Sequence, residues 1–158
     1  MNRHSLTTLA HEAVKESLYL GATAIDATIG NGHDTLFLAT ESGIMGHVYG
    51  FDIQPLAIAQ TEARLACCSN CAHVELFLEN HDRMALRVPT RLRGTVSAIM
   101  FNLGYLPGGD KKIITSPEST LDAIQIAIAY LAEGGTLTII AYRGHPGGQG
   151  EAEVVLDW

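Results

Sequence analysis

The segment Thr23–Thr35 decides the fold, and it reads Thr-Ala-Ile-Asp-Ala-Thr-Ile-Gly-Asn-Gly-His-Asp-Thr. Its first half is a short apolar run of β-prone residues, and the pattern becomes helical after the glycines at 30 and 32. We therefore expect a strand, Thr23–Thr28, that turns sharply into a helix, Asp34–Glu41. Glycine lets a backbone approach a ligand closely, and the free N–H groups at a helix start attract electron-rich groups. This turn is therefore a candidate ligand site.

A second apolar run, His47–Asp52, ends in an acid 22 positions after Gly30. In an open parallel sheet, an acid at this spacing stands at the tip of the neighbouring strand. There a carboxylate accepts hydrogen bonds from both hydroxyls of a ribose. The sequence therefore predicts a cofactor that is an adenosine derivative.

The turn itself indicates which adenosine derivative is bound. A dinucleotide fingerprint has a third glycine, whereas here Gly32 is followed by His33, Asp34 and Thr35. An acid at the helix start would repel a pyrophosphate, which disfavours a nicotinamide dehydrogenase. The same acid suits the cationic sulfonium and ammonium groups of S-adenosylmethionine, whose methionine part would lie over this turn.

Three segments stand out as motifs: Asp26–Thr35, the run Gly-Phe-Asp-Ile-Gln at Gly50–Gln54, and Asn80-His81-Asp82. They resemble motifs of the putative rRNA methylase family of class I methyltransferases, and the likeness extends over nearly the whole chain. The family includes bacterial enzymes that methylate 5-aminomethyl-2-thiouridine at the tRNA wobble position. The resemblance thus implies an RNA substrate, above all tRNA, and a homodimer. The cofactor-binding residues that we assign are Asp26, Gly30, Asn31, Gly32, Asp34, Asp52, Gln54, Asn80 and His81.

Composition favours one globular domain over residues 1–158. With 47% hydrophobic and 17% charged residues, a chain of 158 residues can bury about two thirds of its unfolded surface. Its longest apolar run, near 124–132, is too short to span a bilayer, and the chain does not begin with a signal-peptide pattern. We therefore expect a cytoplasmic protein that does not enter a membrane.

The three cysteines, Cys67, Cys68 and Cys71, are an odd and clustered set. Such a set suits a reducing compartment better than a disulfide framework. Cys68 and Cys71 with His73 would give too few ligands for a zinc site, so no metal is expected.

A net charge of −7 argues against a protein that grips nucleic acid through bulk electrostatics. Most of the basic residues nevertheless lie in the second half, and a local basic rim is enough to bind RNA. The alternative is that they are ordinary solvated side chains. They are Arg83, Arg87, Arg91, Arg93, Lys111, Lys112 and Arg143.

Two further strands end in polar residues. The run His73–Leu78 leads into Asn80 and His81, whose side chains both donate and accept hydrogen bonds, as the edge of an adenine requires. The alternative is a simple turn with a left-handed Asn. We favour adenine contacts because open α/β sheets bind ligands at their strand ends.

The fourth expected strand, Thr95–Phe101, leads into a glycine-rich loop at 102–110. Asn102 and Tyr105 stand at the spacing of the Asn-Pro-Pro-Tyr motif of many amine methyltransferases, with Leu103 and Gly104 in place of the prolines. The Asn carbonyl would hold an N–H of the attacking amine, so we assign Asn102 and Tyr105 as catalytic. A purely structural turn is the alternative.

The remaining segments complete an α/β pattern. We expect helices at His4–Leu20, after Pro55, at Pro117–Leu131 and from Gly150, a fifth strand at Thr136–Tyr142, and surface positions for His4 and His11. The buried stripe of the helix after Pro55 is expected at Leu56, Ala59, Ala63 and Ala66. The loop after the fifth strand supplies Arg143 and His145 as substrate-binding residues.

The expected fold is therefore a Rossmann-like class I methyltransferase with a doubly wound, mainly parallel sheet. It lacks the usual C-terminal strands six and seven, either because the chain is truncated or because the hairpin has been lost. The resembled activity is N-methylation of an aminomethyl-uridine in tRNA. The alternatives are methylation of rRNA or of a small molecule, and a non-catalytic module that binds adenosine or RNA.

Overall fold

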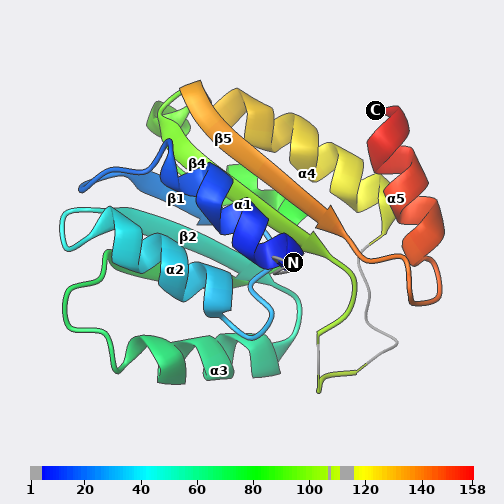
Figure 1. The fold of residues 1–158 in the computed structure, drawn as a ribbon, viewed down its shortest axis with the longest axis horizontal. Coiled ribbons are helices and arrows are strands. Elements are labelled where there is room, and N and C mark those ends of the chain that lie inside the picture. The colour runs from blue at the N-terminus through cyan, green and yellow to red at the C-terminus, as the bar shows by residue number, and fades with distance from the viewer. Residues whose placement is uncertain (1–4, 107, 111–115) are drawn as a thin grey trace, which may run out of the picture.

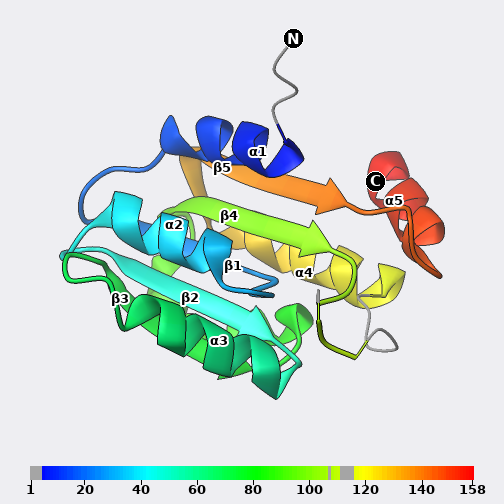
Figure 2. The ribbon, with the colours of Figure 1, turned by 60° about the horizontal axis from the view of Figure 1, so that its bottom comes forward.

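The computed structural model describes residues 5–106, 108–110 and 116–158. Its centre is a sheet of five parallel strands in the order β3-β2-β1-β4-β5, all pointing towards the same edge (Figure 2). No sixth or seventh strand occurs within the described ranges, as expected. The strands are β1 Thr23–Asp26, β2 His47–Asp52, β3 His73–Leu78, β4 Val96–Leu103 and β5 Leu131–Ala141.

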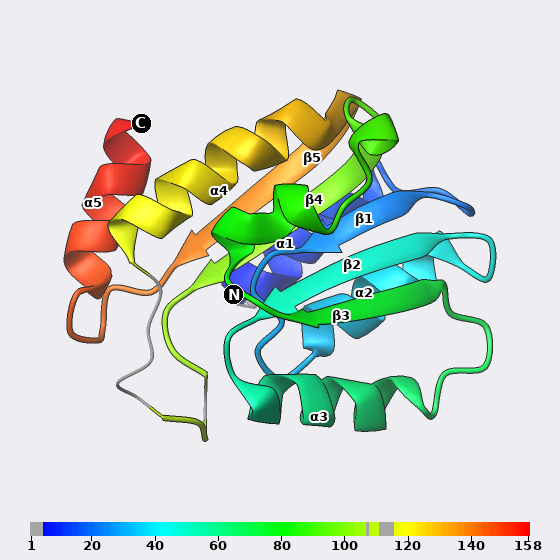
Figure 3. The same cartoon turned by 180° about the vertical axis from the view of Figure 1, so that it is seen from behind.

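Helices cover both faces of the sheet. On one face α1, α2 and α3 pack on the strands, and on the other face α4 packs with η1 and α5 (Figures 1 and 3). This arrangement confirms the doubly wound α/β fold. The helices are α1 Leu6–Lys15, α2 His33–Ser42, α3 Pro55–Leu65, α4 Pro117–Tyr130 and α5 Gly148–Asp157, and the two short 3₁₀ helices are η1 His81–Leu86 and η2 Thr90–Leu92.

The core has two main parts, one on each face of the sheet. Successive side chains of a strand point to opposite faces. Ile25 of β1 and Ile99 of β4 therefore join the cluster beneath α4. Their neighbours Ala24 and Ala98 join the cluster beneath α2. Burial on both faces explains why these strands read as continuous apolar runs in the sequence.

The second half departs from the expected boundaries. β4 runs on to Leu103, so Asn102 belongs to the strand and not to the loop after it. β5 begins at Leu131, which pairs with Val96, and the pairing shifts register just beyond that point. Gly134, with φ of +76°, lies inside β5 and does not end the preceding helix. A glycine in a strand often marks such an irregularity, and only the surrounding pairing distinguishes it from a helix end.

The buried side of α3 is also different from the one expected. Ala57 and Thr61 are buried, whereas Leu56 is exposed. The cause is a close approach between α3 and the turn before α2, because a Cβ on Gly32 would lie 2.4 Å from the Thr61 Oγ1. A small side chain, Thr61, therefore faces the turn at this point. The expected stripe of Leu56, Ala59, Ala63 and Ala66 was wrong.

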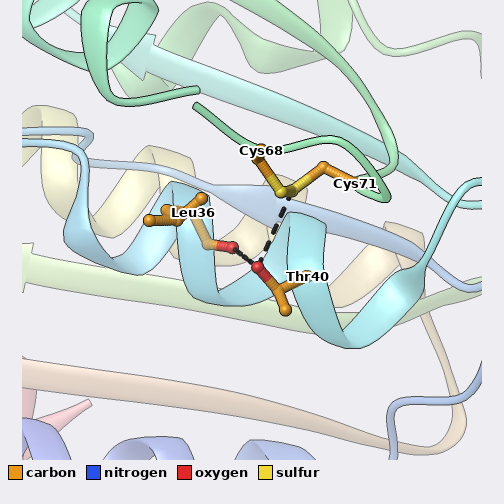
Figure 4. Close-up of a disulfide and its surroundings, with 4 residues drawn as sticks. All are labelled: Leu36, Thr40, Cys68 and Cys71. Atoms are coloured by element: carbon orange, nitrogen blue, oxygen red, sulfur yellow. Dashed lines mark hydrogen bonds between the residues drawn. A yellow bond between two sulfur atoms is a disulfide. The ribbon is translucent and has the colours of Figure 1, made fainter. Parts of the chain in front are cut away.

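Cys68 and Cys71 form a disulfide in the loop between α3 and β3. Figure 4 shows it beside α2, where Thr40 Oγ1 donates to the Leu36 carbonyl and lies 3.7 Å from the Cys71 Sγ. The expectation of reduced thiols was wrong for this pair, since the turn brings the two side chains together. Cys67 is free and exposed.

No helix in the described part of the chain is both long and apolar enough to cross a bilayer. The cytoplasmic location stays a prediction. The cysteines no longer support it, because two of the three form a disulfide and are not reduced thiols.

Candidate active site

A cavity of about 590 Å³ lies at the edge of the sheet where the strands end. It brings together residues from the tips of β1, β2, β3 and β4 and from the loop after β5. Most of the residues assigned from the sequence line it, and they are Gly30, Asn31, Asp34, Asp52, Gln54, Asn80, His81, Asn102, Tyr105 and His145. Asp26, Gly32 and Arg143 do not line it.

Asp52 holds the glycine turn against the end of β2. Its Oδ2 accepts from the Gly30 N–H at 2.9 Å, and its Oδ1 accepts from the Gln54 N–H at 2.9 Å. Burial raises the pKa of Asp52, and these backbone hydrogen bonds oppose the shift. Each carboxylate oxygen keeps a second lone pair, which is what two ribose hydroxyls require.

Gln54 fixes the glycine-rich loop that follows β4. Its Oε1 accepts from the Asp110 N–H at 3.3 Å, and a Cβ on Gly109 would lie 2.5 Å from the same oxygen. Gln54 is buried, although it also contributes to the cavity wall. Pro107 and the two lysines at 111 and 112 lie outside the described residues.

Asp26 supports the turn from behind the cavity and is fully buried. Its carboxylate accepts from Thr35 Oγ1 at 2.6 Å and from the Thr28 N–H at 3.2 Å. Burial, followed by the negative charge of Asp34, raises the pKa of Asp26 to about 7. Asp26 therefore braces the backbone that forms the cavity.

Asp26→Asn should flatten the dependence of stability on pH. The folded state keeps a proton on Asp26 up to about pH 7, whereas the unfolded chain releases it near 3.8. Between these values folding binds a proton, so this group makes the protein less stable as pH rises. Melting temperatures from about pH 4 to 8 should fall less in Asp26→Asn than in the parent. Asp157→Asn, which alters an exposed carboxyl, is the control, and equal slopes would contradict the assignment.

A chain of hydrogen bonds joins α1, α2 and β4 at the cavity floor. His11 Nε2 lies 2.6 Å from the Asp34 Oδ1, and the Asn102 side-chain amide donates to the Asp34 Oδ2. The His11 ring also stacks on Phe37, with centroids 3.8 Å apart. His11 was expected on the surface, and that expectation was wrong. The contacts of His11 with Asp34 and Phe37 were missed because a helical pattern places a side chain on a face without revealing what packs against it.

Asn102 is held in one orientation by these contacts. Its backbone N–H donates to Thr28 Oγ1 at 2.6 Å, and its side-chain nitrogen faces Asp34. A carboxylate accepts hydrogen bonds, so the nitrogen of the amide must be the atom that faces it. The opposite atom, Oδ1, is buried and finds no hydrogen-bond partner among the described residues. A buried acceptor without a partner costs free energy, which a bound N–H group would recover.

His81 lies across the cavity, at the start of η1, and is 3% exposed. Burial lowers its pKa, while Asp82, Glu151 and a hydrogen bond to the Ala27 backbone oppose that shift. Its Nε2 is buried with no partner among the described residues. Together with Asn80, which also lines the cavity, it offers the mixed polar edge expected beside an adenine.

His145 and Tyr105 form one wall of the mouth, with their rings edge to face and 5.7 Å apart. His145 Nδ1 lies 3.1 Å from the Pro146 carbonyl, which only accepts, so Nδ1 carries the proton. The other ring nitrogen, Nε2, thus has a free lone pair, is buried and finds no partner among the described residues.

The predicted basic rim does not surround the cavity. None of its described members lines the cavity, and Arg87 donates to Glu79 and lies over the Phe77 ring. Sequence reasoning also missed several lining residues, namely Thr7, Thr28, His33, Glu79, Leu106, Ser116, Ser119 and Tyr142. Most of these are single polar or apolar residues in loops, for which the sequence pattern carries no specific signal.

Comparisons with known sequences agree with this geometry. The family model described as "Putative rRNA methylase" matches residues 48–158. The chloroplastic tRNA (mnm(5)s(2)U34)-methyltransferase of Arabidopsis thaliana is 41% identical over 161 residues, which cover 97% of this chain. The chain spans 58% of the length of that relative.

Solved structures give the same result. A putative rRNA-methylase from Clostridium thermocellum is 39% identical with a TM-score of 0.91, over 99% of this chain and 82% of the other. A putative methyltransferase from Streptococcus mutans, in complex with SAH, is 35% identical with a TM-score of 0.82, over 98% of this chain and 80% of the other. The family match over residues 48–158 and the 41% identity to the Arabidopsis protein together show that the chain belongs to the putative rRNA methylase family of S-adenosylmethionine-dependent methyltransferases.

Proposed function

We propose that this chain is an S-adenosylmethionine-dependent methyltransferase that N-methylates an aminomethyl-uridine at the tRNA wobble position. The observation that carries the proposal is the Asn102 Oδ1, a buried acceptor without a described partner on a residue that lines the cavity. An amine that attacks a methyl group must be held by its N–H groups, and this oxygen is suited to that purpose.

The residues present fit the cofactor. Asp52 offers spare lone pairs for ribose hydroxyls, and the unpartnered His81 Nε2 offers an acceptor for an adenine amine. The Asp34 carboxylate adds negative charge where the cationic methionine end would lie. When bound, S-adenosylmethionine supplies an electrophilic methyl group on a sulfonium, which is already a good leaving group.

The work of the protein is then to align the acceptor and remove a proton. Asn102 Oδ1 accepts an N–H of the amine and so directs its lone pair into the cavity. The amine must lose one proton as its nitrogen forms the new bond to carbon, and His145 Nε2 has the lone pair to receive it. Tyr105 packs edge to face on the His145 ring and limits its motion.

The tRNA assignment is supported by the named activity of the Arabidopsis relative. Arg143 is exposed in the loop that follows β5, between Tyr142 and Gly144 of the cavity wall, and we propose that it contacts the RNA backbone. We further propose a homodimer and a cytoplasmic location. Light scattering after size-exclusion chromatography tests the homodimer.

Incubation with labelled S-adenosylmethionine and separate pools of tRNA, rRNA and metabolites tests the reaction. Label should enter the tRNA pool, and nucleoside analysis should find it on an aminomethyl-uridine. Label in rRNA or in a metabolite would mean that this molecule, and not tRNA, is the substrate. Cofactor binding without transfer to any pool would favour a non-catalytic module.

His11→Phe should slow methyl transfer about tenfold and change affinity for S-adenosylhomocysteine much less. Phe keeps the stacking on Phe37 but removes the hydrogen bond to Asp34. A hydrogen bond to a charged group contributes about 1.5 to 3 kcal/mol at most. Single-turnover kinetics and calorimetry measure the two quantities. Lys15→Gln, on the same helix, is the control.

A double-mutant cycle makes the test sharper. If His11 acts through Asp34 on Asn102, the effects of His11→Phe and Asn102→Ala should be non-additive. Strict additivity of the two effects would contradict the role of His11 as a positioning residue.

A further inference from the structure

Three ligand-type side chains meet at the end of the sheet opposite the cavity. His47 is the first residue of β2, His73 is the first residue of β3, and the two are direct partners across the parallel ladder. Glu75 follows two residues later on β3 and therefore faces the same side. The ligating atoms of all three lie within 4.8 Å of one another. This cluster lies at the amino ends of the strands and shares no residue with the cavity.

Two imidazoles and one carboxylate are a donor set that suits zinc. Zinc takes His nitrogen and carboxylate oxygen at about 2.0 to 2.2 Å in a tetrahedral shell, so its ligand atoms lie about 3.3 to 3.6 Å apart. The ligating atoms of the cluster would have to approach one another by at most about 1.5 Å to reach this spacing. The His47 side chain is 30% exposed and the Glu75 side chain is 43% exposed, so both have room to close the remaining distance. Water completes the fourth position from the solvent side.

The side chains are already held near the geometry that a metal needs. His47 Nε2 lies 2.7 Å from the Glu75 Oε1, and the His73 ring meets the His47 ring edge to face at 4.8 Å. The His47 ring also stacks on Tyr49, whose ring is buried in the core, with centroids 4.4 Å apart. This stacking limits rotation of the imidazole and lowers the entropy that binding would cost.

Glu75 supplies the one carboxylate of this cluster. Arg91 belongs to η2, at the same end of the sheet, and its positive charge would repel an incoming metal ion.

We propose that His47, His73 and Glu75 bind a zinc ion that fastens the edge strand β3 to β2. The expectation of no metal rested on Cys68 and Cys71 as ligands, and the disulfide occupies both of those sulfurs. The present site uses neither sulfur and is independent of the proposed reaction. The simpler alternative is that His47 and Glu75 form an ordinary ion pair.

Calorimetric titration with zinc chloride tests the site at about pH 7.5, where imidazoles are mostly neutral. The protein should carry Cys67→Ser, because the free thiol is a competing ligand, and should lack an affinity tag and reductant. We expect one zinc ion per chain with a dissociation constant of about 10 µM or tighter, and a melting temperature raised by about 5 °C at saturation. Absence of binding would overturn the proposal.

Substitution of the ligands locates the bound ion. His73→Ala and Glu75→Gln should each weaken zinc binding at least tenfold, since even indirect contacts to a metal ligand are worth that much. Glu153→Gln on α5 removes a distant exposed carboxylate and should change nothing. Glu75→Gln preserves the size of the side chain, so it remains informative if His73→Ala does not fold. Zinc binding that survives both ligand substitutions would also overturn the proposal.

Discussion

Asn102→Ala should lower the single-turnover rate of methyl transfer about 100-fold or more, while affinity for S-adenosylhomocysteine stays unchanged. The side chain bonds to Asp34 through its nitrogen and leaves Oδ1 buried and without a described partner. That oxygen is suited to hold the acceptor amine and has no part in holding the donor. Loss of an interaction that orients the attacking lone pair lowers kcat. It does not weaken the binding that the ground state and the transition state share.

The competing explanation is that Asn102 serves only the local structure. Under that explanation Asn102→Ala would lower the melting temperature, and activity per folded molecule would be nearly intact. Melting temperature, cofactor affinity and single-turnover rate should be measured on the same preparation. A stable, cofactor-competent variant with the parent rate would remove Asn102 from the catalytic site.

Asn102→Asp is the matched variant. It keeps an oxygen at the Oδ1 position but sets a second carboxyl against Asp34, where the amide donates now. Like charges at this distance repel, so we expect a lower melting temperature in addition to slower transfer. An Asp variant with the parent rate would mean that the bond to Asp34 does not orient the amide.

Asp52→Ala should weaken binding of S-adenosylhomocysteine by about 1.5 to 3 kcal/mol, or roughly 10- to 150-fold. The variant loses the proposed bonds to the ribose and also frees the N–H groups of Gly30 and Gln54, which now bond to the carboxylate. Calorimetry measures the affinity, and Asp122→Asn on α4 is the control. Unchanged affinity in a folded Asp52→Ala variant would mean that the ribose assignment is wrong.

The pH dependence of cofactor binding offers a second test of Asp52. Burial raises the pKa of this carboxyl, so acid should protonate it sooner than an exposed aspartate. A protonated acid has fewer lone pairs for the ribose, and affinity in the parent should therefore fall as pH falls through the raised pKa. The dependence should be weaker in Asp52→Ala.

The sequence predicted the elements whose signals are local. β2 and β3 begin and end at the expected residues, because each is a short apolar run with a clear break on either side. The glycine turn and the acid at the tip of β2 also come together as expected, since parallel strands bring their carboxyl ends to one edge. The α/β fold and the cofactor class followed from these features, whereas the family was predicted from the resemblance of its motifs.

The features that the sequence did not predict depend on distant parts of the chain. The bond from His11 to Asp34 joins two helices, and helical periodicity carries no information about such a partner. Gly134 reads as a helix end until the register of β5 against β4 is known. The pairing of Cys68 with Cys71 depends on the shape of the turn, which places the two sulfurs together.

The hydroxyl of Thr28 helps to form the cavity before any ligand binds. Backbone pairing between β1 and β4 reaches its last register pair at Asp26 and Met100, yet β4 continues beside β5 to Leu103. Beyond Met100, the Asn102 N–H donates a hydrogen bond to Thr28 Oγ1 in place of a main-chain carbonyl. The two strands can therefore separate without leaving a buried donor unpaired. The floor of the cavity is thus preorganised, so a ligand does not have to order it on binding, and more of the interaction free energy remains available as affinity.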